Sequence, residues 1–261
     1  MFMEERHQAI LNHVKAAGRI SIGEIQETFG VSPDSARRDL RVLEERGLLK
    51  RTHGGAIPLR KVDDRPPRVR ELTPENIQEN YLRIAKAGAA LVEPGDCVYL
   101  NNGSVGYLAL RFLPRDFEYT LVVNSPALAN ELKLWDNVAV YVTGGLMRMR
   151  SNASLVDGFA AAFIRNMQLD LCLMTGAGID ADFGFSNGSE ETAVFQRAVL
   201  EHSRRKALLM AGPKVGFRAF IKVCDAKCYD TLITDWIAPE DELAKLEELG
   251  LEVKVVEEPT P

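Results

Sequence analysis

Long apolar runs and cysteines are both scarce in this sequence. Its 261 residues contain no stretch of the roughly 18–20 apolar residues that spans a bilayer, and the first residues, MFMEERH, are charged where a signal peptide needs an apolar block. We therefore expect a soluble, cytoplasmic protein with no membrane partner. The four cysteines are too few for a disulfide scaffold, and Cys224 and Cys228 have no histidine nearby, so we expect no metal site.

The chain also lacks a strong net charge. Its 32 basic and 37 acidic residues give −5, which by itself argues against a nucleic-acid partner. The charge is unevenly divided, because residues 1–61 carry 11 Lys and Arg against 8 Asp and Glu, whereas residues 62–261 carry 21 against 29. The stretch VDDRPPRVRELTP, from Val62, is rich in proline and charge without apolar periodicity, as linkers are. We therefore expect two domains, 1–61 and 81–258, joined by a linker at 62–80.

Three helix patterns follow one another in the first domain. Residues 5–17 show an apolar stripe at helical spacing. The S-x-x-E run at 21–24 has the form of a capping box, which begins a second, short helix. After a tight turn, Ser32 is expected to cap a third helix that has Pro33 at its first position and runs to about residue 46. This order of helix, short helix, turn and helix predicts a helix-turn-helix.

The outer face of the third helix carries residues suited to DNA. With Ala36, Leu40 and Leu43 turned inward, its arginines lie where a recognition helix meets bases and phosphates. The alternative is a solvated helix with ion pairs such as Arg41 with Glu45, its charge diluted by acidic residues that include Asp39. The next segment, LLKRTHGGAI, is typical of two strands around a glycine turn, which would form a wing. The residues expected to contact DNA are Ser32, Ser35, Arg37, Arg38, Arg41, Lys50, Arg51, His53 and Gly54.

Residues 31–56, VSPDSARRDLRVLEERGLLKRTHGGA, resemble the signature of the DeoR-type winged helix-turn-helix. The shared features are the Val-Ser turn, the Arg-Arg-Asp-Leu run and the His-Gly-Gly-Ala wing. The sequence departs from the family where Ser35-Ala36 replaces Thr-Ile, which keeps the hydroxyl and shrinks the apolar residue; this bears on the operator sequence. The resemblance implies double-stranded DNA as a partner and transcriptional regulation as the function.

Helix and strand patterns alternate from Tyr81 onward. The expected strands are apolar throughout, as strands buried on both faces are, and helix patterns follow most of them. A helix is expected at 156–167, and a long loop between the strand at 169–174 and the helix at 190–202. The sequence thus predicts an α/β chain with a mostly parallel sheet in the larger domain. Its strands are expected at 97–100, 120–123, 138–142, 169–174, 207–210, 231–234 and 253–256.

Glycine and polar residues directly follow five of these strands. Because the carboxyl ends of parallel strands meet at one edge, we expect the five loops to share a pocket in which glycine lets backbone approach a ligand closely. Lys214, with Arg148 or Arg218 as further basic groups, points to a small phosphorylated ligand. The alternative is that these are ordinary turn residues. The loops lie at 101–104, 124–125, 143–145, 175–180 and 211–214.

The run GAGIDA at 176–181 fits the dinucleotide pattern G-x-G-x-x-G/A. That motif requires a helix to open at once, whereas DFGFSNG, which follows, is typical of a loop. We therefore expect no nicotinamide cofactor, and no other cofactor is indicated.

From about Lys86 to Asp235 the chain resembles the DeoR-type sensor domain, which is similar in fold to ribose-5-phosphate isomerase and the wider group of sugar-phosphate isomerases and CoA-transferases. The resemblance rests on short motifs in order, among them Gly103-Ser104, Asn124-Ser125, Gly144-Gly145 and Ile233-Thr234-Asp235. It implies an effector pocket for a sugar phosphate. The residues expected there are Asn101, Gly103, Ser104, Asn124, Gly144, Gly145, Gly178, Asp180 and Lys214.

Two departures from the family pattern indicate an unusual effector. Asn101 and Val105 stand in a segment where the family has Asp-x-Gly-Thr-Thr, and Ala211 stands where the family has Asp, so two carboxylates that bind sugar hydroxyls are missing. An isomerase with a DNA-binding appendage is one alternative, with Asp180 as its base. A protein-interaction module with a degenerate pocket is another. We expect a homo-oligomeric repressor of a sugar or related carbon-use operon, with no catalytic residue.

Overall fold

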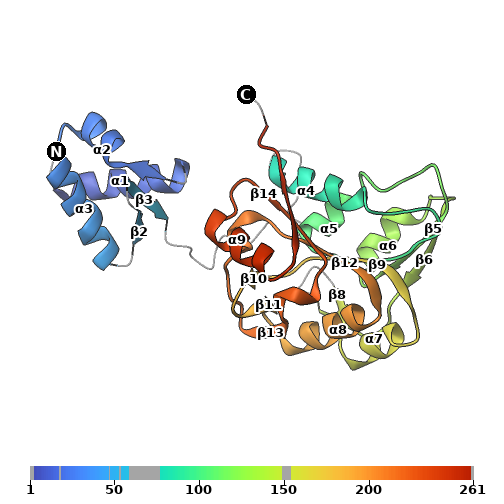
Figure 1. Ribbon diagram of the computed structural model, residues 1–261. Helices are drawn as coiled ribbons and strands as arrows, with labels where there is room; N and C mark the ends of the chain where they lie inside the picture. Colours follow the sequence, from blue (N-terminus) through green and yellow to red (C-terminus); the bar gives the residue numbers. More distant parts are fainter. Residues whose placement is uncertain are drawn as a thin grey trace. The chain divides into compact units, whose positions relative to one another are not determined.

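The computed structural model describes residues 3–17, 19–46, 48–52, 54–58, 77–148 and 154–259 (Figure 1). The chain divides into two compact units, Met1–Arg65 and Pro66–Pro261. The limits expected for the domains and linker, 1–61, 62–80 and 81–258, stay a prediction. No helix within the described ranges is long and apolar enough to cross a membrane.

The first unit is a winged helix-turn-helix, as predicted. The capping box forms, with Ser21 Oγ accepting from Glu24 N at 3.1 Å and Glu24 Oε2 accepting from Ser21 N at 2.6 Å. Gly30 ends that helix in the left-handed conformation, at φ 63°, and Ser32 caps the next one. The elements are α1 (Met3–Ala17), β1 (Ile20–Ser21), α2 (Ile22–Phe29), α3 (Pro33–Glu45), β2 (Leu49–Thr52) and β3 (Gly55–Pro58).

A small core joins the helices of this unit to its sheet. The three strands are antiparallel in the order β1, β3, β2, so the wing is anchored to the chain that precedes α2. The expected inward residues of α3 are all buried, whereas Ile22 and Phe29 of α2 are only half-buried against the core. The buried core residues are Ile10, Val14, Ile20, Ile25, Ala36, Leu40, Leu43, Leu49 and Ala56.

The second unit is built on a seven-stranded sheet in which every neighbouring pair is parallel. This confirms the predicted α/β class, and all seven predicted strands are present with small shifts at their ends. In spatial order the strands are β15 (Glu252–Val256), β14 (Thr231–Asp235), β12 (Ser203–Leu209), β9 (Leu169–Met174), β4 (Cys97–Leu100), β5 (Tyr119–Val123) and β6 (Val138–Val142).

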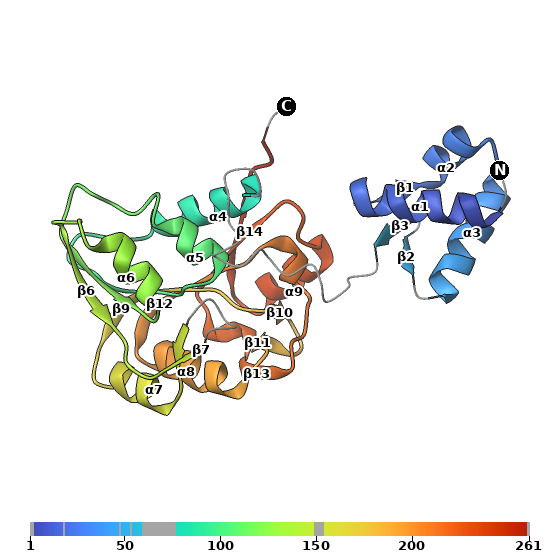
Figure 2. The same cartoon turned by 180° about the vertical axis from the view of Figure 1, so that it is seen from behind.

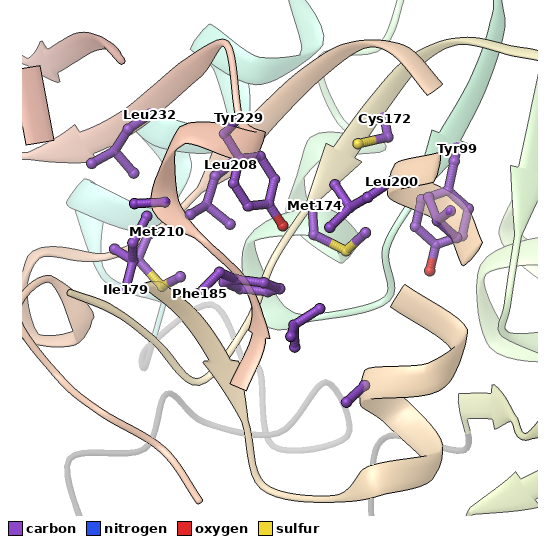
Figure 3. Close-up of a cluster of buried hydrophobic side chains, with 14 of the residues drawn as sticks. Tyr99, Cys172, Met174, Ile179, Phe185, Leu200, Leu208, Met210, Tyr229 and Leu232 are labelled. Carbon is purple, nitrogen blue, oxygen red and sulfur yellow. The ribbon is translucent and has the colours of Figure 1, made fainter. Parts of the chain in front are cut away.

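Two apolar cores cover the faces of this sheet. Alternate residues of the five inner strands enter opposite cores: Leu232 lies in one, and Ile233 in the other. Figures 1 and 2 show helices on both faces. One core includes α4 (Glu79–Ala89), α5 (Ser104–Ala109) and α6 (Pro126–Leu132). The other, where Phe185, Met174 and Tyr229 gather (Figure 3), includes α7 (Gly158–Ile164), α8 (Glu190–Glu201) and α9 (Glu240–Glu248).

The sequence patterns did not predict β1 in the first unit or five short strands in the second. The expected loop at 175–189 contains a hairpin of β10 (Gly178–Asp180) and β11 (Gly184–Asn187), to which β13 (Ile221–Cys224) adds a third antiparallel strand. The helix expected from 156 begins at Gly158, because β8 (Ser154–Val156) pairs with β7 (Leu146–Arg148) and Asp157 caps α7. The five strands of the second unit have only three or four residues each, which is too short to show a strand periodicity. The dinucleotide-like run GAGIDA thus leads into a hairpin and opens no helix.

Candidate DNA-binding face and effector site

The exposed face of α3 presents arginines with little competition from neighbouring carboxylates. Arg37, Arg38 and Arg41 are all exposed. Arg37 Nη1 lies 3.1 Å from Asp34 Oδ1, whereas within the described residues neither Arg38 nor Arg41 has a side-chain partner, and the alternative pair of Arg41 with Glu45 is not formed. Two guanidinium groups therefore face solvent ready for phosphate oxygens.

The hydroxyls expected at this helix start are used in capping. Ser35 N donates to Ser32 Oγ at 3.3 Å, and Ser32 Oγ donates to Ser35 Oγ at 3.0 Å. Ser32 is exposed and Ser35 half-buried, so both lie at the edge of the α3 face. Their contact with DNA stays a prediction.

Asp39 is a buried residue of α3, which corrects its assignment to the solvated face. It is 2% exposed, and it receives Arg6 Nε on Oδ2 at 2.7 Å and meets His7 Nε2 with Oδ1 at 3.0 Å. Burial opposes ionisation of Asp39, but the bonds from Arg6 and His7 outweigh it and hold the pKa of the carboxyl below its usual range. The charge counted as diluting the arginines is instead committed to fixing α3 on α1.

The wing is tied to α3 through Arg51. Its Nε lies 2.7 Å from Glu44 Oε2, and its backbone N donates to Glu44 Oε1 at 2.8 Å. Gly54 is exposed, and its carbonyl accepts from Ile22 N at 2.9 Å. His53 lies outside the described residues, as does the side chain of Lys50, so their DNA contacts stay predictions.

At the carboxyl edge of the large sheet, the loops after β4 and β9 are locked together. Asn101 Oδ1 accepts from Gly103 N at 3.0 Å and from the Thr175 hydroxyl. A Cβ on Gly103 would lie 2.1 Å from Thr175 Oγ1, so only glycine allows this approach. The loop that carries Ser104 therefore touches the loop after β9, as the common strand edge predicts. Thr175 is missing from the predicted site, although its place directly after a strand is the same signal.

Lys214 lies on the third loop of this group. It ends the 3₁₀ turn η2 (Gly212–Lys214), and its Nζ donates to Gly176 O at 2.9 Å. Desolvation of the half-buried side chain lowers the pKa of its amine from 10.5 to about 8, and no carboxylate in the described part of the chain opposes this. A desolvated ammonium without a counter-charge can accept an anion as its partner, and contact of Lys214 with an effector stays a prediction.

The other two basic candidates are already paired. Arg148 Nη1 lies 2.9 Å from Glu191 Oε2, and Arg218 Nη2 lies 2.9 Å from both Asp180 Oδ1 and Asp182 Oδ2. Their charge is thus used within the fold. Lys214 is the basic residue that the structure leaves for a ligand among these three.

Asp180 is engaged inside the β10–β11 hairpin. Besides Arg218, its Oδ1 accepts from Asp182 N at 3.0 Å and Phe183 N at 2.8 Å. Burial opposes its ionisation, but these bonds outweigh it and keep the pKa below its usual range. Nearby Gly178 is required by packing, since its Cβ would lie 2.2 Å from Phe217 O. Contact of either with an effector stays a prediction.

The remaining predicted residues follow β5 and β6. Asn124 is 2% exposed, its carbonyl accepts from Leu155 N at 2.7 Å, and its side-chain Oδ1 has no partner in the described residues. Gly144 is exposed with open space around it, while Gly145, at φ 108°, packs against the cap residue Asp157. The residues after β5 and β6 are connected to the loop after β4 through Ser154, whose Oγ donates to Asn102 Oδ1 at 3.0 Å.

Comparison with known families and proteins matches both units. Residues 6–61 match the DeoR-like helix-turn-helix domain, and residues 77–236 match the DeoR C-terminal sensor domain. The HTH-type transcriptional regulator GlpR of Haloferax volcanii is 30% identical over 97% of this chain and 98% of its own. The glycerol-3-phosphate regulon repressor of Escherichia coli is 29% identical over 90% of this chain and 92% of its own.

Solved structures give weaker likenesses. A probable sor operon regulator from Shigella flexneri aligns with 79% of this chain and 97% of its own, at 15% identity and a TM-score of 0.42. Ribose 5-phosphate isomerase A from Neisseria gonorrhoeae aligns with 53% of this chain and 54% of its own, at 13% identity and a TM-score of 0.37. The matches of both units, together with a relative that is similar over nearly the whole chain, show that this protein belongs to the DeoR family of transcriptional regulators.

Proposed function

We propose that this regulator represses a sugar or related carbon-use operon and that a small phosphorylated metabolite, bound at the carboxyl edge of the large sheet, releases it from DNA. The observation that carries the effector half is the Lys214 amine, desolvated and facing no carboxylate of the described residues. A phosphate ester, with up to two negative charges and three acceptor oxygens, supplies the missing counter-charge.

The chemistry next to Lys214 suits a phosphate. Its bond to Gly176 O places it beside Thr175, which in turn contacts the Asn101–Gly103 loop that leads into Ser104. Glycine at 103 lets the backbone of this loop pack directly against Thr175, which holds the two loops together beside Lys214. The described residues thus bring one cation, backbone and hydroxyl groups to one edge of the sheet.

The DNA half rests on Arg38 and Arg41 of α3. A single recognition helix and wing cover one half-site, so we include a homo-oligomer on repeated half-sites in the proposal. Sedimentation of the free protein and of its complex with DNA measures the number of copies. If a monomer binds DNA with full affinity, the homo-oligomer is not part of the function.

An isomerase is the alternative, and the environment of Asp180 argues against it. A general base for proton transfer between sugar carbons works best with a pKa near the operating pH. Asp180 is instead paired with Arg218, and its pKa lies below its usual range. Incubation with pentose and hexose phosphates, followed by NMR, should show no isomer, and turnover that Asp180→Asn abolishes would establish the enzyme.

Thermal shift with inorganic phosphate and a panel of sugar and polyol phosphates tests the effector site. We expect a phosphorylated compound to raise the melting temperature of the native chain, and Lys214→Met to abolish that shift while DNA affinity is kept. Lys133→Met, which makes the same substitution at an exposed lysine, serves as the control and should respond like the native chain. A full shift in Lys214→Met would show that the site lies elsewhere.

A further inference from the structure

Asp235, the last residue of β14, is a fully buried carboxylate that no cation neutralises within the described residues. Its Oδ1 accepts from Ile237 N at 2.9 Å, and its Oδ2 accepts from both Gly212 N at 3.0 Å and Asn80 Nδ2 at 2.8 Å. The stability of a buried carboxylate that is held by neutral donors depends on every one of its hydrogen bonds. If one bond is missing, that oxygen has neither water nor a protein donor.

The Gly212 donor opens the turn that carries Lys214. A Cβ on Gly212 would lie 2.4 Å from Ala238 N and 2.6 Å from Asp235 Oδ1, so the turn sits tightly against the end of β14. Two residues later, Lys214 extends its amine to Gly176 O. The position of that amine therefore depends on how Asp235 holds the start of the turn.

The Asn80 donor lies in the first turn of α4. This helix is the first described element after residues 59–76, the part of the sequence that follows the winged helix-turn-helix. Asn80 is buried, and its own Oδ1 accepts from Tyr81 N at 3.0 Å, which fixes the side-chain amide. One oxygen of Asp235, which lies 155 positions after Asn80 in sequence, thus joins the Lys214 turn to the start of α4.

We propose that Asp235 is a positioning residue for Lys214 and that, through Asn80, it couples occupancy of the effector site to the start of α4. The inference rests on the proposed function and adds how the site is regulated. An anion that pulls the Lys214 amine away from Gly176 O moves the turn. This movement changes the position of the Gly212 N–H relative to Asp235 Oδ2. Because Asn80 donates to the same oxygen, its bond changes with that shift, and α4 responds.

Asn80→Ala in the full chain removes the α4 donor to Asp235, together with the side-chain acceptor of Tyr81 N, and leaves the Gly212 and Ile237 donors in place. Glu79→Ala is the matched control, because it breaks the exposed Glu79–Arg83 pair in the same turn without touching Asp235. Without any ligand, we expect residue-resolved amide exchange of Gly212 to rise about fivefold in Asn80→Ala, the effect of losing one hydrogen bond of average strength. Unchanged Gly212 exchange, or an equal rise in Glu79→Ala, overturns the link.

Inorganic phosphate then tests occupancy. In the native chain we expect phosphate to slow exchange in the Lys214 turn and to alter it at Leu82 and the next amides of α4; in Asn80→Ala the turn should still respond and α4 should not. If α4 responds alike in both proteins, or in neither, the coupling is wrong and the effector site stands. If phosphate leaves the native turn unchanged, the effector site fails and the coupling to occupancy fails with it.

Discussion

The two units use their cations in opposite ways. In the winged helix-turn-helix, Arg6 is committed to the buried carboxylate of Asp39, which also bonds to His7, while Arg38 and Arg41 stand in water without partners among the described residues. In the sensor unit, the half-buried Arg148 and the exposed Arg218 are paired, and of the three basic candidates the desolvated Lys214 is the one without a carboxylate partner among the described residues. Exposed arginines stay charged at every physiological pH and suit a polyanion, whereas a desolvated lysine suits one small anion and responds to pH.

The largest effect is expected inside the first unit. Asp39→Ala leaves Arg6 and His7 without their shared acceptor, and we expect the free energy of unfolding of this unit to fall by about 3 kcal/mol. Because the folded-state pKa of Asp39 lies below its ordinary value of 3.8, this stabilisation is present at neutral pH and is lost as pH falls through the folded-state pKa. Amide exchange of α1 and α3 in increasing urea measures it.

Asp34→Ala is the control, since Asp34 is an exposed partner of Arg37 on the same helix. It should change stability by less than about 0.5 kcal/mol. Equal losses of stability in the two variants would mean that the buried and the exposed ion pair of this unit contribute equally to stability.

The next effect concerns the unpaired arginines of α3. We expect Arg38→Ala combined with Arg41→Ala to weaken binding to a duplex selected from a random library by roughly a hundredfold, as loss of two charge-assisted bonds implies. The slope of log affinity against log salt should fall by about two. Fluorescence anisotropy across a salt series measures both, with Arg83→Ala, which removes a paired arginine of α4, as the control. An unchanged slope would falsify the phosphate contacts.

A smaller effect is expected where the loops after β4 and β9 meet. In Gly103→Ala the added methyl collides with Thr175, which pushes the two loops apart, so phosphate affinity should fall roughly thirtyfold, as overpacking of about 2 kcal/mol gives. Calorimetry with the compound found by thermal shift measures it. Gly144→Ala, whose methyl enters open space, should bind normally. If both variants bind normally, these loops do not form the site.

The smallest effect is a difference in how phosphate affinity and DNA affinity depend on pH. The Lys214 amine, with its pKa lowered to about 8, is protonated below that pH and loses its charge above it. Phosphate affinity should therefore fall about tenfold from pH 7 to pH 9, while DNA affinity through arginine stays level. Calorimetry and anisotropy over this range compare the two. Parallel pH profiles would contradict the different use of cations in the two units.

Patterns within short windows predicted most of this fold. The seven parallel strands are continuous apolar runs, and the caps of α2 and α3 are local motifs, so both are visible in sequence. Strands β10 and β11 were invisible because glycine, serine and asparagine interrupt them, and β13, IKVC, is too short to show a periodicity. They form because the chain around them supplies their partners.

For the sites, sequence predicted the loops at the strand edge but not which cations are free. Asp39 and its partners are more than thirty residues apart, and Asp235 and Asn80 are 155 apart. Residue type alone puts a charged residue on the surface. Only the packing of α1 on α3, and of α4 on β14, shows that these carboxylates are interior.

A genetic screen for variants that no longer repress would distinguish the two adjacent glycines of the wing. A Cβ on Gly55 would lie 2.0 Å from the carbonyl of Ile20, so any side chain there forces β3 off β1 and moves the wing. Gly54 has open space around it and would tolerate alanine. Substitutions at Gly55 would thus be recovered as loss-of-function alleles with no DNA contact of their own, and second-site suppressors would be found on β1.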